Sequence, residues 1–310
     1  MSRVNQVTTT NAWALDANTI GLALFAHTAF GLYVVLIKYL LRYLPAFASL
    51  AVAFGLAVPI AFLVARRNLN WGRLWRTDML LLSGIVIARS VSKLLAVQFT
   101  LATYVQLIDL SIPFLAPIAA WILLRERMPS GTLRALAITA LGSFLVIAAD
   151  PFHVRLPNGK SDLIGVALAL VSSIMMALGV VLTRYLTNQK VSPTSVFFQQ
   201  LLAVAVAYAA LSALSGESWQ PFASMALSTW MIYGLFILFA VFGGGLTQVL
   251  AISHINASLF STLLSWRLVI AVGAGWLLLG ERLTSAWQAL GVGMVIMSIT
   301  LYLRHQARQA

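Results

Sequence analysis

The chain has 310 residues, of which 61% are hydrophobic and only 9% are charged, and its mean hydropathy is +0.92. A soluble domain carries roughly 25% charged residues, so this inventory cannot build a water-soluble surface and the bilayer must be the solvent. The net charge of +12 fits basic segments at the ends of membrane spans, and nucleic-acid binding is not expected, because no polar segment combines a basic patch with interleaved aromatic residues.

Apolar runs of about 20 residues recur along the chain and predict transmembrane helices rather than the alternating ten-residue strands of a barrel. The polar residues 1–18 precede an apolar run without a small-residue cleavage site, so this run is expected to be a retained helix rather than a signal peptide. A linker is expected at 150–161, which contains two prolines and a glycine. The predicted fold is an all-α integral membrane protein with ten transmembrane helices. The expected spans are about 19–41, 45–65, 78–99, 103–124, 131–149, 162–186, 193–214, 227–252, 257–279 and 284–303.

Basic residues are shared unevenly between the two sides of this predicted bundle. If the N-terminus is cytoplasmic, twelve of the 20 Lys and Arg residues fall on the cytoplasmic side, five on the outer side and three within spans. Cytoplasmic loops carry the excess of Lys and Arg in membrane proteins. Both termini are therefore expected in the cytoplasm.

Two long segments of the chain repeat each other at a distance of 155 residues. Residues 88–147 align without a gap with 243–302, so that the Trp and the Glu-Arg pair of 121–127 meet those of 276–282. Each half holds five predicted spans, an odd number, so the second copy must enter the membrane from the opposite side. The pattern predicts an inverted-topology repeat, as in many secondary transporters, with the halves at residues 1–155 and 156–310.

These features resemble the EamA-type branch of the drug/metabolite transporter superfamily. Residues 103–149 and 258–303 carry the clearest similarity: an apolar helix, a Glu-Arg pair and a final apolar helix, although Arg125 stands where the second copy has Gly280. Within that superfamily the sequence is most similar to YddG-type bacterial exporters of aromatic and other amino acids. The resemblance implies a central substrate cavity formed by the first four spans of each half. It also implies export of amino acids or related small metabolites by alternating access across the bacterial inner membrane.

Charged side chains inside a span are costly and usually mark a cavity or a partner. Arg89 and Lys93 lie four residues apart, on one face of the helix predicted at 78–99. Asp109 is the only acidic residue well inside a predicted span, and Arg267 lies near the middle of 257–279. One hypothesis is that Asp109 and a neighbouring cation bind the ammonium and carboxylate groups of a zwitterion, with Arg267 as a second carboxylate ligand. The alternative is a structural ion pair between helices, or snorkelling of Arg89 and Lys93.

The remaining candidates are neutral or titrate near neutral pH. His27 is the one histidine inside a predicted span; it could carry protons or hydrogen-bond between helices. Serines in spans also bond to neighbouring helix backbones, and aromatic residues also anchor helices at the interface, so each assignment has a structural alternative. The other candidate cavity-lining residues are Tyr33, Gln98, Ser111, Ser173, Gln199, Gln248, Ser261, Ser265 and Trp266.

Two groups of residues are candidate pivots for alternating access. Pro113 and Pro117 lie within the predicted span 103–124, where each removes a backbone hydrogen bond and favours a kink. Gly243, Gly244 and Gly245 lie within 227–252 and permit bending or close packing. Kinks also occur in static membrane helices, so a purely structural role is the alternative.

An enzymatic function is not expected, because the necessary groups are missing from the sequence. The chain has no Walker-type Gly-rich motif for a nucleotide, no metal-ligand spacing and no cysteine. No cofactor or metal is therefore expected, and the expected partners are a small-molecule substrate and the lipid bilayer. The driving force stays open between facilitated diffusion and proton antiport.

Two alternative functions remain. The first is a drug or toxic-cation exporter of the same superfamily, which Asp109 favours and the net positive charge disfavours. The second is a non-transporting membrane scaffold or subunit. The inverted repeat weighs against the second, because a scaffold gains little from pseudo-symmetry.

Overall fold

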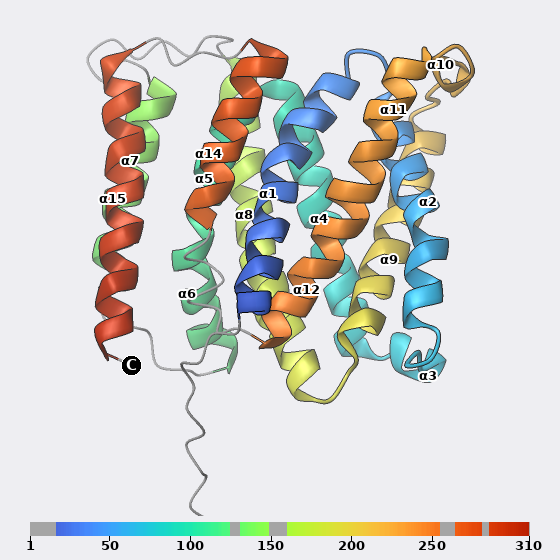
Figure 1. Cartoon of the computed structure of the whole chain (residues 1–310), viewed down its shortest axis with the longest axis horizontal. Coiled ribbons are helices and arrows are strands. Elements are labelled where there is room, and N and C mark those ends of the chain that lie inside the picture. The colour runs from blue at the N-terminus through green and yellow to red at the C-terminus, as the bar shows by residue number, and fades with distance from the viewer. Residues whose placement is uncertain (1–16, 125–130, 149–159, 255–263, 281–284, 310) are drawn as a thin grey trace, which may run out of the picture.

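A computed structural model describes residues 17–124, 131–148, 160–254, 264–280 and 285–309, and within these ranges all regular structure is helical. Figure 1 shows a bundle whose long helices run up and down between two faces. Within the described residues, six continuous helical segments are long and apolar enough to cross a membrane. These are α1 (Ala17–Leu40), α2 (Ala46–Ala65), α4 (Thr77–Phe99), α8 (Lys160–Asn188), α9 (Pro193–Leu214) and the run of α11 (Leu227–Leu235), η1 (Phe236–Gly243) and α12 (Gly244–His254).

Shorter apolar helices occupy the other four predicted spans. The predicted span 103–124 is divided into two helices, and the beginning of the predicted span 257–279 lies outside the described residues, as does most of the predicted linker 150–161. Two single-turn helices, α3 (Trp71–Leu74) and α10 (Gln220–Ala223), lie in connections where no helix was expected. The helices in these spans are α5 (Ala102–Asp109), α6 (Ile112–Leu124), α7 (Thr132–Ala148), α14 (Leu264–Ala274) with η2 (Gly275–Leu279), and α15 (Ala286–Gln309), of which the apolar part is Ala286–Tyr302.

Helix ends coincide with residues that cannot continue a helix or that satisfy its free backbone groups. Pro193 occupies the first turn of α9, where a missing N–H costs nothing. The first turn of α2 is capped by a residue far away in the sequence, because the N–H groups of Phe47 and Ala48 donate to the Glu217 carboxylate at 3.0 and 2.6 Å. A carboxylate at this position satisfies two free donors and complements the helix dipole. The loop after α9 is thereby fastened to α2.

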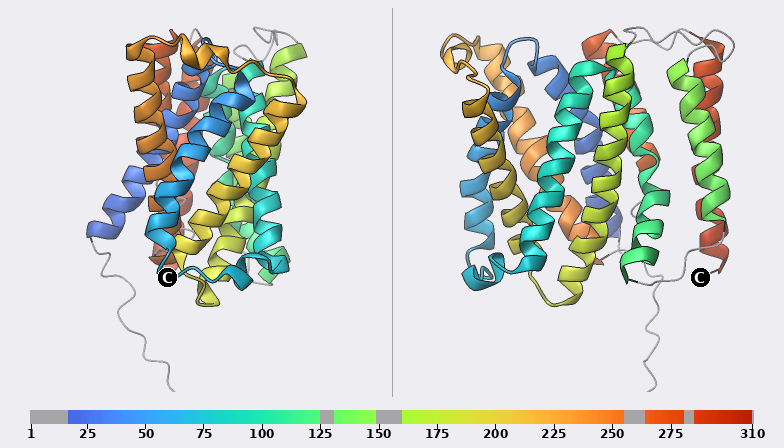
Figure 2. Two further views of the ribbon diagram at one scale, coloured as in Figure 1. Left: turned by 90° about the vertical axis from the view of Figure 1, so that its right-hand side faces the viewer. Right: turned by 180° about the vertical axis from the view of Figure 1, so that it is seen from behind.

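The helices associate in a regular set of pairs. α4 packs against α8, α2 against α9, α7 against α15, and α1 against η1, α12 and α14. Figures 1 and 2 show α7 and α15 together at one end of the molecule, with α2 and α9 at the opposite end. The pairs α4–α8 and α1–α12 therefore form the central part, where side chains from both halves meet.

Glycines allow several of these helix pairs to approach closely, as is common in membrane proteins. A Cβ atom on Gly165 of α8 would lie 2.7 Å from Cβ of Thr100, just beyond α4. On Gly142 of α7 it would lie 2.8 Å from the backbone oxygen of Gly291 in α15. The contact leaves no room for a side chain, so the sequence positions of these glycines fix where the helices cross.

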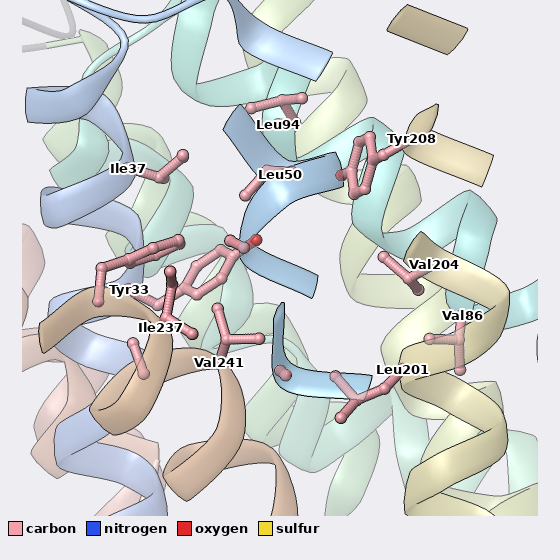
Figure 3. Close-up of a cluster of buried hydrophobic side chains, with 14 of the residues drawn as sticks. Tyr33, Ile37, Leu50, Val86, Leu94, Leu201, Val204, Tyr208, Ile237 and Val241 are labelled. Atoms are coloured by element: carbon pink, nitrogen blue, oxygen red, sulfur yellow. The ribbon is translucent and has the colours of Figure 1, made fainter. Parts of the chain in front are cut away.

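The main hydrophobic core lies between the two halves and includes residues from α1, α2, α4, α9 and η1. Figure 3 shows Tyr33, Leu50, Val86, Leu201 and Tyr208 among the side chains that meet there. Large apolar side chains are also exposed on the outside of the bundle, for example Leu63, Leu163, Leu238 and Leu301. An apolar exterior around a packed interior suits a protein whose solvent is lipid.

Candidate functional site

A cavity opens among α1, α2, α4, α8, α9, η1, α12 and α14, so both halves of the chain contribute to it. The cavity has a volume of about 60 Å³, which is enough for several water molecules. The apolar part of its wall includes Phe30, Tyr33, Phe54 and Phe197. The polar part of its wall consists of Arg89, Ser90, Lys93, Gln200, Gln248 and Arg267.

Asp109 lies beside this cavity, at the last residue of α5. The helix is weak at this point because Pro113 has no N–H to donate to the Asp109 carbonyl. The chain turns through Leu110 and Ser111 and resumes as α6 at Ile112, with the Ser111 N–H bonded to the Ile108 carbonyl at 2.9 Å. The predicted single span is thus a broken helix, with a carboxylate at the break.

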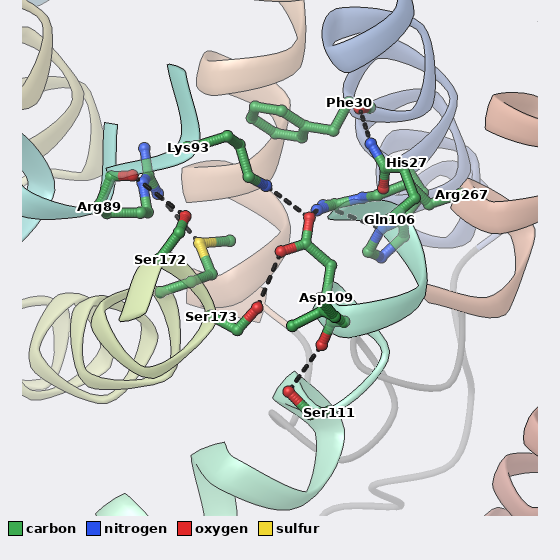
Figure 4. Close-up of polar contacts among 12 residues, drawn as sticks. His27, Phe30, Arg89, Lys93, Gln106, Asp109, Ser111, Ser172, Ser173 and Arg267 are labelled. Carbon is green, nitrogen blue, oxygen red and sulfur yellow. Dashed lines mark hydrogen bonds and ion pairs between the residues drawn. The ribbon is translucent and has the colours of Figure 1, made fainter. Parts of the chain in front are cut away.

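The Asp109 carboxylate joins three other helices, and we call Asp109, Lys93, Ser173 and Arg267 the ion cluster (Figure 4). Its Oδ2 accepts a hydrogen bond from Nζ of Lys93 in α4 at 2.5 Å and lies 3.7 Å from Nη1 of Arg267 in α14. Its Oδ1 accepts from the Ser173 hydroxyl of α8 at 3.0 Å. The Asp109 side chain is 1% exposed and that of Arg267 is 2% exposed. Such buried charges are tolerated only when their partners are well placed.

Arg267 makes further contacts with α1. Its guanidinium carbon lies 4.9 Å from the centre of the Phe30 ring, a cation–π distance, and its Nη2 lies 3.5 Å from Nδ1 of the buried His27. Within the described residues its Nε has no hydrogen-bond partner. Gln106 of α5 donates to the backbone carbonyl of Phe30 at 3.1 Å, which ties α5 to α1 at the residue whose ring covers the cation.

Arg89 lines the same cavity but has a different environment. Its Nη1 lies 3.0 Å from the thioether sulfur of Met176, and its carbonyl accepts from the Ser172 hydroxyl at 3.0 Å. Among the residues that the structure describes, no carboxylate lies within ion-pair distance of its guanidinium. Arg89 and Lys93 both line the cavity, as their four-residue spacing on α4 predicts.

The structure divides the predicted site residues into three groups. Tyr33, Arg89, Lys93, Gln248 and Arg267 line the cavity. Asp109, Ser173 and His27 lie behind this lining, in or against the ion cluster. The third group lies elsewhere, is bonded to other groups, or falls outside the described residues.

Within that third group, Gln199 donates to Ser83 at 2.9 Å, and the Ser111 hydroxyl donates to the Ile108 carbonyl at 2.7 Å. Gln98 is exposed on α4, because five residues after Lys93 turn a helix by about 140° away from the cavity. Trp266 is also exposed and donates to the Thr28 hydroxyl at 2.9 Å. Neither of these two belongs to the cavity lining. Ser261 lies outside the described residues, and so does the side chain of Ser265.

The predicted pivots fall at irregular points of the helices. Pro117 lies inside α6, while Pro113 is its second residue and directly follows the break. Gly243 ends the π-helical segment η1, and Gly244 and Gly245 begin α12. A Cβ on Gly244 would lie 2.8 Å from that of Ala29, so this glycine also has a packing role.

Several lining residues were not expected from the sequence, among them Phe30, Ser90, Met176 and Gln200. The Ser90 hydroxyl lies 2.9 Å from that of Tyr208, and Gln200 donates to Thr183 at 3.3 Å. For Ser90 and Gln200, the sequence signal was their position next to the candidates Arg89 and Gln199. Apolar residues such as Phe30 and Met176 carry no signal of their own in so apolar a chain.

Comparisons with known proteins agree with this architecture. The EamA-like transporter family model matches residues 18–148 and 163–304, one match in each half. A comparison with curated proteins finds no match. A solved structure titled only "Crystal structure of protein" is similar, with a TM-score of 0.61 and 14% identity, covering 90% of this chain and 98% of the other. That similarity supports the fold alone.

Proposed function

Because the chain belongs to the EamA-like transporter family, whose members are membrane transporters of small substrates, we propose that it exports amino acids and related small metabolites by alternating access. The observation that carries this proposal is the ion cluster beside a cavity built from both halves. Charged groups held inside a membrane bundle are typical of substrate pathways. The proposed location is the bacterial inner membrane, with both termini in the cytoplasm.

The pattern of helix pairs supports ten spans in two inverted repeats. In the proposed repeat, α1 corresponds to α8, and α4 corresponds to the run from α11 to α12. Exchanging the halves therefore turns the α4–α8 pair into the α12–α1 pair, and both are present. In the pairs α2–α9 and α7–α15 the two partners correspond to each other in the repeat, so the exchange leaves each pair unchanged. A pseudo-twofold axis in the membrane plane produces this relation.

Alternating access requires that one end of the bundle opens while the other closes. At the face where α1 ends, Lys38 donates to the Thr100 carbonyl, and the Thr100 hydroxyl donates to Asp162 at 2.7 Å. These contacts tie α1, α4 and α8 together, and we propose that they separate when this face opens. The α5–α6 break and the π-helical η1 are the proposed points of bending, because irregular backbone in membrane helices lies where it lines cavities.

The cation-exporter alternative has less support. Asp109 is the acidic group nearest the cavity in the described part of the chain, and it already accepts from Lys93 and Ser173. A cationic drug would have to displace at least one of these donors. No other observation favours that function.

Transport by the purified protein in proteoliposomes tests the proposal. A panel of labelled amino acids, assayed with and without a proton gradient, is expected to include at least one that shows saturable flux. Arg267→Ala is expected to reduce that flux, whereas Arg134→Ala, on the exposed face of α7, serves as the charge-removal control and should not. Absence of flux for the whole panel would refute the function, and normal kinetics in Arg267→Ala would remove Arg267 from the site.

A further inference from the structure

We propose that the cavity recognises its substrate by an anionic group, so that it binds organic carboxylates with an apolar body in preference to the zwitterion or the cation of the same skeleton. This inference rests on the proposed transport function and names the substrate class of that site. It departs from recognition of an ammonium group by Asp109. Three separate features of the cavity carry it.

The first feature is the balance of charge. The cavity wall contains three basic side chains, Arg89, Lys93 and Arg267, and no acidic side chain among the residues that form it. Asp109 is the one carboxylate that reaches them in the described residues, as the partner of Lys93 and Arg267. Positive charge thus exceeds negative charge by two, and buried charge without a counter-ion is unfavourable. A bound anion would reduce this imbalance, and a bound cation would increase it.

The second feature is that Asp109 is already occupied. Oδ2 faces Lys93 and Arg267, Oδ1 accepts from Ser173, and the side chain is 1% exposed. An ammonium group could reach it only by displacing one of these donors. The carboxylate therefore orients the cations of the cavity instead of receiving the substrate.

The third feature is a pair of donors that converge on a poor acceptor. Nη1 of Arg89 lies 3.0 Å and Nε2 of Gln248 lies 3.8 Å from the sulfur of Met176. These donors come from α4 and α12, one in each half of the chain, and both residues line the cavity. A thioether sulfur is a weak acceptor on a flexible side chain, whereas a guanidinium binds a carboxylate through two parallel bonds. A substrate carboxylate that moved the Met176 side chain aside would satisfy both donors.

The rest of the wall defines the other part of the substrate. Phe30, Tyr33, Phe54 and Phe197 supply aromatic surface around these cations. An apolar or aromatic group attached to the carboxylate would lie against these rings. The inferred class therefore includes N-acylated amino acids and aryl or alkyl carboxylic acids.

Three ligands with one skeleton test the inference directly: phenylalanine, N-acetylphenylalanine and phenylalaninamide. At about pH 6, well below the usual pKa of an α-amino group, they are zwitterion, anion and cation. Binding to the purified protein is measured by thermal shift or calorimetry, and flux is measured separately by counterflow in proteoliposomes. We expect N-acetylphenylalanine to bind at least about tenfold more tightly than phenylalanine, because it lacks the positive ammonium charge that the buried cations would repel. Phenylalaninamide is expected not to bind. Equal or tighter binding of the amide overturns the inference.

The two measurements separate this inference from the proposed function. Saturable flux of phenylalanine without preference for the anion overturns the inference and leaves transport standing. Binding of the anion without flux of any ligand or any amino acid of the panel supports the inference and overturns transport. Neither binding nor flux of any of them overturns both.

Variants locate the site. Arg89→Met removes the charge and retains the length of the side chain, and it is expected to weaken anion binding about 30-fold. Arg89→Lys, which keeps the charge without the bidentate geometry, should lie between this variant and the parent. Met176→Leu keeps the volume and removes the sulfur that competes for Arg89 and Gln248. It should bind the anion more tightly than the parent, and it provides the test if the Arg89 variants do not fold. Arg134→Met, on α7, is the matched control. Unchanged or weaker binding in Met176→Leu, or no loss in a folded Arg89→Met, overturns the assignment.

Discussion

The ion cluster leads to an asymmetric prediction for stability. With an effective dielectric constant of about 20, Asp109 attracts Lys93 at 2.5 Å by about 6–7 kcal/mol and Arg267 at 3.7 Å by about 4–5 kcal/mol. Burial of the charges offsets most of this attraction. Asp109→Asn removes the carboxylate that both cations share, so we expect a loss of about 3–5 kcal/mol in the free energy of unfolding, as for other broken buried pairs.

Lys93→Met should behave differently. It leaves Asp109 in contact with Arg267 and Ser173 and lowers the excess of positive charge. We therefore expect a cost of about 1 kcal/mol or less, since no buried charge loses its last partner. Removing the acid should thus cost several times more than removing the base, although both belong to one ion pair.

Thermal unfolding in detergent, followed by size-exclusion chromatography of heated samples, measures both variants. At about 2–4 °C for each kcal/mol, Asp109→Asn should lower the midpoint by about 6–20 °C. Asp78→Asn is the matched control, because Asp78 pairs with Arg73 at 2.8 Å where both side chains are partly exposed, and such pairs contribute about 1 kcal/mol or less. Equal losses for Asp109→Asn and Lys93→Met would refute the description of Asp109 as the shared partner.

Three further predictions concern helix capping, helix packing and the cavity wall. Glu217→Ala should lower the free energy of unfolding by about 1–2 kcal/mol, because the first turn of α2 loses its cap; an unchanged thermal midpoint would contradict this. Gly165→Ala should destabilise by about 1–3 kcal/mol through overpacking at the α4–α8 crossing, whereas Gly84→Ala, where a Cβ meets no atom within 4 Å, should not; similar midpoints for the two variants would show that the crossing can relax. Gln98→Ala should leave transport kinetics unchanged, because the side chain points away from the cavity; a raised KM would place it in the substrate path.

The sequence alone determined the solvent and the positions of most helices. In lipid, the backbone N–H and C=O groups of a long apolar run can form their hydrogen bonds only within a helix. The residue ranges of the helices therefore follow from the positions of the apolar runs. The span predicted at 193–214 coincides with α9, and those at 45–65 and 78–99 differ from α2 and α4 by one residue. The repeat at 155 residues indicated the family, because a repeat is visible in the order of residues without knowledge of their contacts.

Only the tertiary structure decided which polar groups meet. Asp109, Lys93 and Arg267 were each conspicuous in the sequence, but their contact depends on the rotation of three helices about their axes. Gln98 was an equally plausible candidate and lies on the wrong face of α4. In a chain that is apolar on nearly all sides, the hydrophobic pattern does not show which face of a helix is inside.

The broken helix at Asp109 shows the same limit. Pro113 made a kink predictable, since it removes one backbone donor. Whether the helix bends or stops depends on which neighbours satisfy the freed groups, and these neighbours belong to other helices. The sequence therefore specified where the backbone is weak, and helix packing decided that this weak point places the Asp109 carboxylate between two cations, Lys93 and Arg267.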